Sequence, residues 1–101
     1  PPDLALGWSP EARWANLEHA TATIEGYSLH AQQSRGHALA SFWINRDGDP
    51  TFVISSGGSQ VEADHETGAS ALYMAQVEAE KALRDHFMSN PIMRKLLGLE
   101  A

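Results

Sequence analysis

The clearest pattern of apolar and polar positions lies between residues 37 and 56. Two apolar segments, at 38–44 and 52–54, flank a polar stretch at 46–50 that contains Asp-Gly and Asp-Pro. Aromatic and β-branched residues in both segments favour strands, while aspartate, glycine and proline favour the turn between them. This pattern predicts an antiparallel β-hairpin.

The first predicted strand, at 38–44, carries apolar side chains on both faces. Phe42 and Ile44 point to one side, and Leu39 and Trp43 point to the other, because side chains alternate along a strand. A strand of this kind is covered on both faces. The hairpin is therefore predicted to have a surplus apolar face, which meets helices, another domain or a second copy of the chain.

A second turn is predicted at 56–59, where two glycines lie between serines. After it, Val61 and Ala63 alternate with polar neighbours, which predicts a short third strand at 60–63. The predicted sheet is therefore a β-hairpin or a three-strand meander.

Residues 10–34 show a different pattern, with apolar positions three and four residues apart, which is typical of an amphipathic helix. The stripe consists of Trp14, Leu17, Thr21, Ile24, Ser28 and Ala31. Ser9 and Pro10 suit the start of a helix, and Gly36 suits its end. Gly26 interrupts the pattern, and the alternative is a break there, with residues 27–32 forming an additional strand.

Two further helices are predicted near the C-terminus. Residues 68–88 carry the most regular helical stripe, formed by Ala69, Leu72, Gln76, Ala79, Leu83 and Phe87. Asn90 and Pro91 end that helix and begin a short one over 91–97. The predicted fold is α+β: a long N-terminal helix, an antiparallel β-hairpin or three-strand meander, a long helix and a short C-terminal helix.

Length and composition indicate one small α+β domain over residues 1–101, with residues 1–9 as an extended arm. The chain begins with Pro1 and not with Met, which is expected of a processed form or of a domain excised from a larger protein. No apolar run reaches the ~18 residues of a membrane span, and no signal peptide pattern is present. The chain has no cysteine, which excludes disulfides and cysteine catalysis and favours a cytoplasmic location.

The net charge of −6 is unevenly distributed along the chain. Residues 1–80 contain eleven acidic and three basic residues, a net charge of −8. Residues 81–101 contain four basic and two acidic residues, a net charge of +2. An acidic body repels phosphate backbones, which argues against nonspecific nucleic-acid binding.

Asp64, His65 and Glu66 place three potential metal ligands in one predicted loop. Adjacent residues rarely bind one ion, and no paired histidine spacing supports them, so a solvated helix-capping cluster is favoured. A small metal-dependent hydrolase using these residues with His30 or His37 is the least favoured hypothesis, and no cofactor is predicted.

Glu80 lies on or beside the apolar stripe of the 68–88 segment, where a buried carboxylate would be a candidate for acid–base chemistry. Arg84 lies four residues further on and indicates an ordinary surface pair instead. No serine occurs in a nucleophile motif. The sequence therefore favours a noncatalytic protein.

The favoured function is a protein–protein interaction or self-association module, such as a bacterial adaptor or accessory domain, with a second copy or another protein as partner. The predicted interface consists of Trp8, Leu39, Trp43, Val53, Ile92, Leu96 and Leu99. The alternative is an accessory domain of a nucleic-acid-processing protein. Its predicted phosphate contacts are Lys81, Arg84, Arg94 and Lys95.

Overall fold

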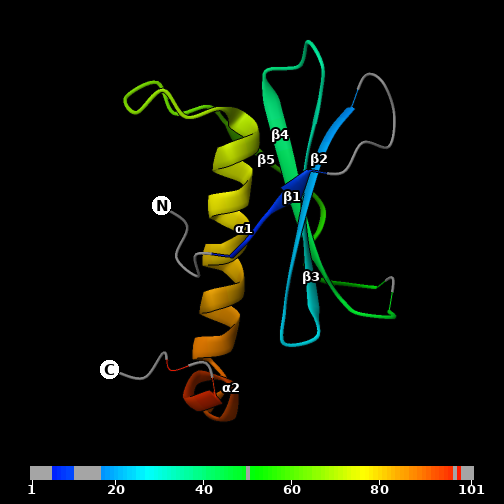
Figure 1. Ribbon diagram of the computed structural model, residues 1–101, viewed down its shortest axis with the longest axis vertical. Coiled ribbons are helices and arrows are strands. Elements are labelled where there is room, and N and C mark those ends of the chain that lie inside the picture. Colours follow the sequence, from blue (N-terminus) through cyan, green and yellow to red (C-terminus); the bar gives the residue numbers. More distant parts are fainter. Residues whose placement is uncertain (1–5, 11–16, 50, 97, 99–101) are drawn as a thin grey trace.

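The computed structural model describes residues 6–10, 17–49, 51–96 and 98, with the backbone alone for residues 55–59 and 96. Its elements are β1 (Ser9–Pro10), β2 (Leu17–Ile24), β3 (Tyr27–Ser34), β4 (Leu39–Arg46), β5 (Phe52–Glu62), α1 (Ala71–Met88) and α2 (Pro91–Leu96). Each strand pairs antiparallel with the strand before it, so the sheet has the order β1-β2-β3-β4-β5. Helix α1 runs along one face of this sheet, and α2 follows at the lower end of α1 (Figure 1).

The predicted long helix over residues 10–34 is wrong, because the described part of that segment forms β2 and β3. The chain reverses at Glu25 and Gly26, whose φ angles of 47° and 80° lie in the left-handed region. Two left-handed residues in a tight turn match the twist of a β-hairpin. The alternative of a break at Gly26 followed by a strand is the one observed.

A strand pattern was present in that segment beside the helical one. Ala20 and Ala22 on β2, and Leu29 and Ala31 on β3, are buried at every second position. Threonine and isoleucine in β2 also suit a pleated strand better than a helix. Tertiary packing of the alternating face therefore outweighed the helical propensity of the alanine and glutamine residues.

The predicted three-strand meander is also wrong, since the described residues form a sheet of five strands. The hairpin around the Asp47–Gly48 turn is formed by β4 and β5 at one edge of the sheet, and Gly48 has a φ of 80° there. The predicted turn at 56–59 and strand at 60–63 fall largely within one long strand, β5. The register of β5 against β4 shifts between Phe42 and Ile44, so these glycine-rich residues bulge without ending the strand.

The core lies between α1 and the covered face of the sheet. Its helical side consists of Ala71, Ala75, Ala79, Leu83 and Phe87, all buried and spaced four residues apart. Alanine at the upper positions lets the helix lie close to the strands, and the two large residues fill the lower half of the layer. The Ser70 hydroxyl caps this helix by accepting a hydrogen bond from the Tyr73 amide at 3.1 Å.

Neither helix of the described residues has the combination of length and apolar composition needed to cross a membrane.

Candidate functional site

The face of the sheet opposite α1 is the candidate functional surface, and we call it the open face. Side chains that are direct partners across neighbouring strands share a face, as His30 and Trp43 do. The register of the strands assigns to it Leu17, His19, Thr21, Thr23, Ser28, His30, Gln32, Ser34, Leu39, Ser41, Trp43, Asn45, Phe52, Gln60 and Glu62. Both described helices lie on the other side of the sheet (Figure 1).

The open face is nearly free of formal charge. Among the residues that the register assigns to it, Glu62 is the only carboxylate, and no lysine or arginine is present. The chain as a whole is 20% charged, so this depletion is a property of the face. Depletion of charge together with aromatic residues is typical of the core of a protein interface.

Three aromatic rings from three strands stack at the centre of the open face. The His30 and Trp43 rings are nearly parallel, with centroids 5.0 Å apart and planes 8° apart. His19 completes the stack, 5.3 Å from His30 and 5.6 Å from Trp43. His19 Nε2 and His30 Nδ1 are 3.2 Å apart and share a hydrogen bond. The stack ties β2, β3 and β4 together, and because His19 is buried, the half-buried His30 and Trp43 rings form the aromatic centre of the face.

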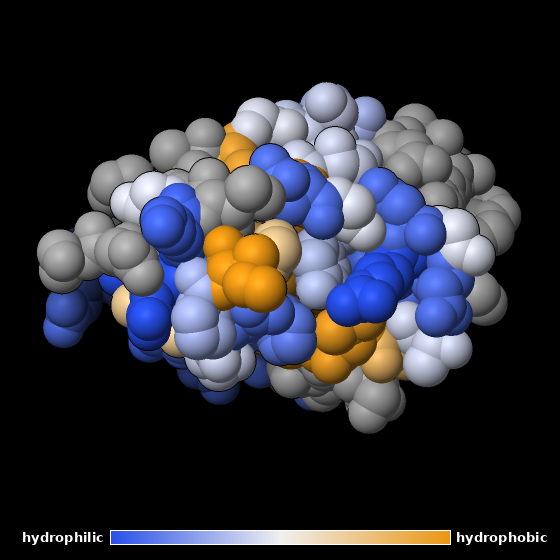
Figure 2. Space-filling model, turned by 90° about the horizontal axis from the view of Figure 1, so that it is seen from below, coloured by the Kyte–Doolittle hydropathy of each residue, from blue (hydrophilic) through white to orange (hydrophobic). Residues whose placement is uncertain are grey.

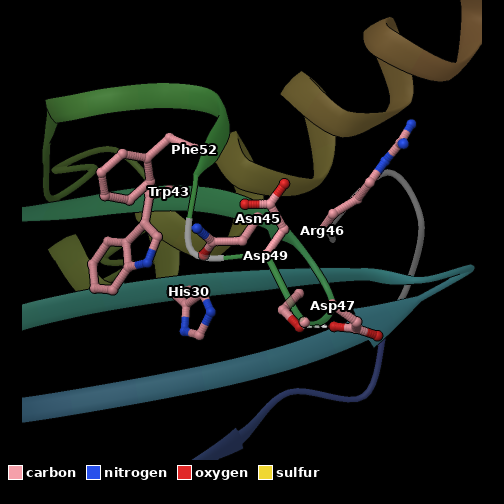
Figure 3. Close-up of a pocket in the computed structure, with 9 residues that line it drawn as sticks. His30, Trp43, Asn45, Arg46, Asp47, Asp49 and Phe52 are labelled. Carbon is pink, nitrogen blue, oxygen red and sulfur yellow. Dashed lines mark hydrogen bonds between the residues drawn. The ribbon is translucent and has the colours of Figure 1, made fainter.

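Beside the stack, an open groove of about 520 Å³ lies over the lower ends of β3, β4 and β5. Trp43 and Phe52 form its aromatic side, and Asn45, Asp47 and Asp49 lie at its polar end (Figure 3). Phe52 is 45% exposed, so its ring is accessible to a partner. The groove therefore combines aromatic surface with carboxylates, a pairing suited to a cationic group.

The two carboxylates of the groove are held by different contacts. Asp47 accepts a hydrogen bond from the Ser28 hydroxyl. Asp49 Oδ1 accepts from the Thr51 amide at 2.9 Å, and this backbone bond, with help from the Thr51 side chain, lowers the pKa of Asp49. Both carboxylates are exposed. Among the described residues that line the groove, Arg46 is the only arginine or lysine.

Arg46 is part of the groove wall but turns its guanidinium away from the aromatic side (Figure 3). Its Nη2 donates to the Tyr27 hydroxyl at 3.3 Å, and its Cζ lies 5.6 Å from the centre of the Tyr27 ring. The hydrogen bond to Tyr27 is the main cause that raises the pKa of Arg46, with a smaller contribution from the charge of Asp49. The charge of Arg46 therefore acts on Asp49, and Asp47 is the carboxylate of the groove that is better placed to pair with an external cation.

Asp64, His65 and Glu66, the weak metal candidates, lie in the loop before α1. Asp64 Oδ1 accepts from the Glu66 amide at 3.0 Å, and its Oδ2 accepts from the Thr67 hydroxyl at 2.9 Å. These bonds, that of Thr67 first, lower the pKa of Asp64. The described residues contain no group of three or more potential ligands arranged around a metal position.

Trp8, predicted as an interface anchor, packs partly buried against the core cluster. Its indole Nε1 donates to Glu80 Oε2 at 2.7 Å, and the Leu6 amide donates to Glu80 Oε1 at 3.3 Å. Glu80 is fully buried, so its carboxylate fastens the N-terminal arm to α1. A sequence separation of 72 residues gives no local signal for this contact.

The other predicted interface residues are dispersed. Leu39 and Trp43 share the open face, and Val53, which is 38% exposed, belongs to the irregular part of β5. Ile92 is 76% exposed on α2, on the helical side of the molecule. The side chain of Leu96 and all of Leu99 lie outside the described residues. The structure thus brings together only the part of the predicted interface that lies on the sheet.

The predicted phosphate contacts belong to the helical layer. Lys81 and Arg84 lie on α1, and Arg94 and Lys95 lie in the last turn of α2. Arg94 Nη1 donates to the Met88 carbonyl at 3.3 Å, where it helps to close the end of α1. These residues are therefore separate from the open face and its groove.

Comparisons with known proteins identified no relative of this chain. The chain matches no protein-family model, and no curated protein or solved structure is detectably similar to it.

The sequence reasoning missed His19, Asp47 and Phe52 as members of one surface. His19 and His30 are eleven residues apart and meet only because β2 and β3 form a hairpin. The alternation of residues 17–24 and 27–34 with a period of two was the signal that would have placed them on one face.

Proposed function

We propose that this chain is a noncatalytic self-association module that forms a twofold dimer through the open face of its sheet. The single observation that carries the proposal is the composition of that face, which combines an aromatic centre with almost no formal charge. A cytoplasmic location belongs to the same proposal and is supported by a chain that contains no cysteine.

The charge pattern makes a second copy the occupant that fits best. Two chains of net charge −6 repel each other over most of their surfaces. The centre of the open face carries no carboxylate, so two copies that meet there bring no like charges together at the centre of the contact. Facing sheets pack at about 10 Å and interdigitate half-buried side chains such as those of Ser41 and Trp43.

The end of the molecule that carries α2 is the competing surface. Viewed from below, it shows separate small apolar patches divided by hydrophilic residues (Figure 2). Ile92 is the most exposed large apolar residue described there. A broken pattern of this kind is ordinary for a monomer surface, whereas an interface core is contiguous.

A charge placed at the centre of the open face is expected to abolish association. Gln32 lies there, half-buried and paired with Ser41 and His19. Gln32→Glu keeps the size of the side chain but brings two like charges together near the twofold axis. We expect association to weaken by about tenfold or more, measured by sedimentation equilibrium over a range of protein concentrations.

Gln33→Glu is the matched control, since Gln33 lies on the same strand but on the opposite face. We expect this variant to associate like the unmodified protein, and circular dichroism checks that both variants fold. Ile92→Glu is the second control and tests the α2 surface. Equal association of the Gln32→Glu and Gln33→Glu proteins, or loss of association in Ile92→Glu alone, would contradict the proposal.

A further inference from the structure

The two ends of the sheet differ in charge. The β3–β4 turn at the upper end contains Arg35, which is exposed and has no carboxylate partner within the described part of the chain (Figure 1). The lower end contains the groove with Asp47, whose described contact is the Ser28 hydroxyl and not a basic residue. Within the described residues, one end thus offers a cation without a carboxylate partner, and the other offers an accessible anion beside aromatic rings.

A twofold axis between facing sheets brings these ends together. If the axis lies in the interface and perpendicular to the strands, the copies run in opposite directions, and each strand lies over its own counterpart. We place this axis at the level of Ala31 and Phe42. These two residues are direct partners near the middle of β3 and β4. Arg35 lies four residues above that level, about 13 Å along the strand.

The same distance below the axis reaches the level of Tyr27 and Arg46, which are also direct partners. Ser28 lies next to that level on β3, and its hydroxyl contacts Asp47. The lateral position also matches, because Arg35 continues β3 and the groove lies over β3, β4 and β5. The axis therefore places Arg35 of one copy above the groove of the other.

We propose that the groove is the receptor for Arg35 of a second copy, with the guanidinium paired to Asp47 and lying against the Trp43 and Phe52 rings. This inference rests on the proposed self-association and specifies its geometry. Twofold symmetry forms the contact twice in each dimer. It also fixes the antiparallel arrangement, since a parallel stack would place Arg35 above the β3–β4 turn of its partner.

Arginine suits this groove for chemical reasons. A guanidinium presents a planar fork of donors to a carboxylate and can stack on an aromatic ring at the same time. The groove provides both partners within one open volume of about 520 Å³. Asn45 adds a side-chain amide at the polar end, next to Asp49 (Figure 3).

Other basic residues of the described chain are less suited. Arg46 is engaged with Tyr27, and Arg94 donates to the Met88 carbonyl. Lys81 and Arg84 lie on α1 and Lys95 lies on α2, so all three are on the other side of the sheet (Figure 1). Among the described residues, Arg35 is therefore the basic residue that lies at the edge of the open face without such a contact.

Charge reversal provides the test, with dimerisation of the full chain measured by sedimentation equilibrium. Arg35→Asp and Asp47→Arg are each expected to weaken association by about tenfold, because each affects two symmetric contacts. The doubly reversed variant, Arg35→Asp with Asp47→Arg, is expected to recover association to within about threefold of the unmodified protein. Asp47→Asn is a milder variant that removes the charge and can keep the hydrogen bond from Ser28.

The outcomes separate this inference from the proposed function. If the unmodified chain and all of these variants dimerise equally, the Arg35 contact is wrong while self-association stands. If both single variants weaken association and the double variant does not restore it, the pairing of Arg35 with Asp47 is overturned. If the unmodified chain remains monomeric at every concentration tested, the proposed function fails, and the inference fails with it.

Discussion

Phe87→Ala is expected to lower the free energy of unfolding by about 3–5 kcal/mol. Phe87 is fully buried at the lower end of α1, and its ring packs edge-on against Tyr27 with centroids 5.3 Å apart. Truncation removes the apolar contacts of the ring and leaves a cavity between helix and sheet that neighbouring residues fill only in part. Since small domains are stable by about 5–15 kcal/mol, this loss is a large share of the total.

Urea unfolding followed by circular dichroism measures the effect, with Ile92→Ala as the control. Ile92 is 76% exposed, so its truncation is expected to change stability by less than about 0.5 kcal/mol. Similar losses in the two variants would mean that α1 does not pack on the sheet through Phe87.

Trp8→Phe is expected to lower the free energy of unfolding by about 2 kcal/mol. The substitution keeps most of the aromatic ring but removes the indole donor that reaches Glu80 Oε2 at 2.7 Å. The carboxylate of Glu80 is fully buried, so it loses a charge-assisted bond that water does not readily replace. The N-terminal arm is expected to detach from α1 at lower denaturant concentration than the core unfolds.

A double-mutant cycle isolates this contact from simple loss of packing. Glu80→Met replaces the carboxylate with an apolar side chain of similar size, which no longer needs the indole donor. Trp8→Phe is then expected to cost less in the Glu80→Met background than in the unmodified chain, by about 1–2 kcal/mol. Equal costs in both backgrounds would show that the hydrogen bond contributes nothing to stability.

Local sequence patterns predicted some elements better than others. The helix α1 falls within residues 68–88, where apolar positions repeat at helical spacing without an interruption. The segment 10–34 carried two periods at once, and its helical spacing was the misleading one. The turn at Gly26 decides between them, because a hairpin there lets β2 and β3 bury alanines on the same face of the sheet.

The candidate site depends on register, which local patterns do not define. Leu39 and Trp43 were correctly placed on a face away from Phe42, since alternation within one strand is a local property. The positions of His19 and Phe52 beside Trp43 follow from pairing with other strands. The contact between Trp8 and Glu80 joins the first and last parts of the fold, and only the assembled sheet and helix bring them together.

Cross-linking measures directly whether two copies of the chain meet through the open face. The chain contains no cysteine, so a single introduced thiol is the only cross-linking site. Ser41→Cys places it near the proposed axis, where facing sheets about 10 Å apart are within reach of a short bismaleimide. Ser89→Cys, at the end of α1, is the matched control. We predict rapid covalent dimer formation by Ser41→Cys alone. Equally slow reaction of both variants would contradict dimerisation through the open face.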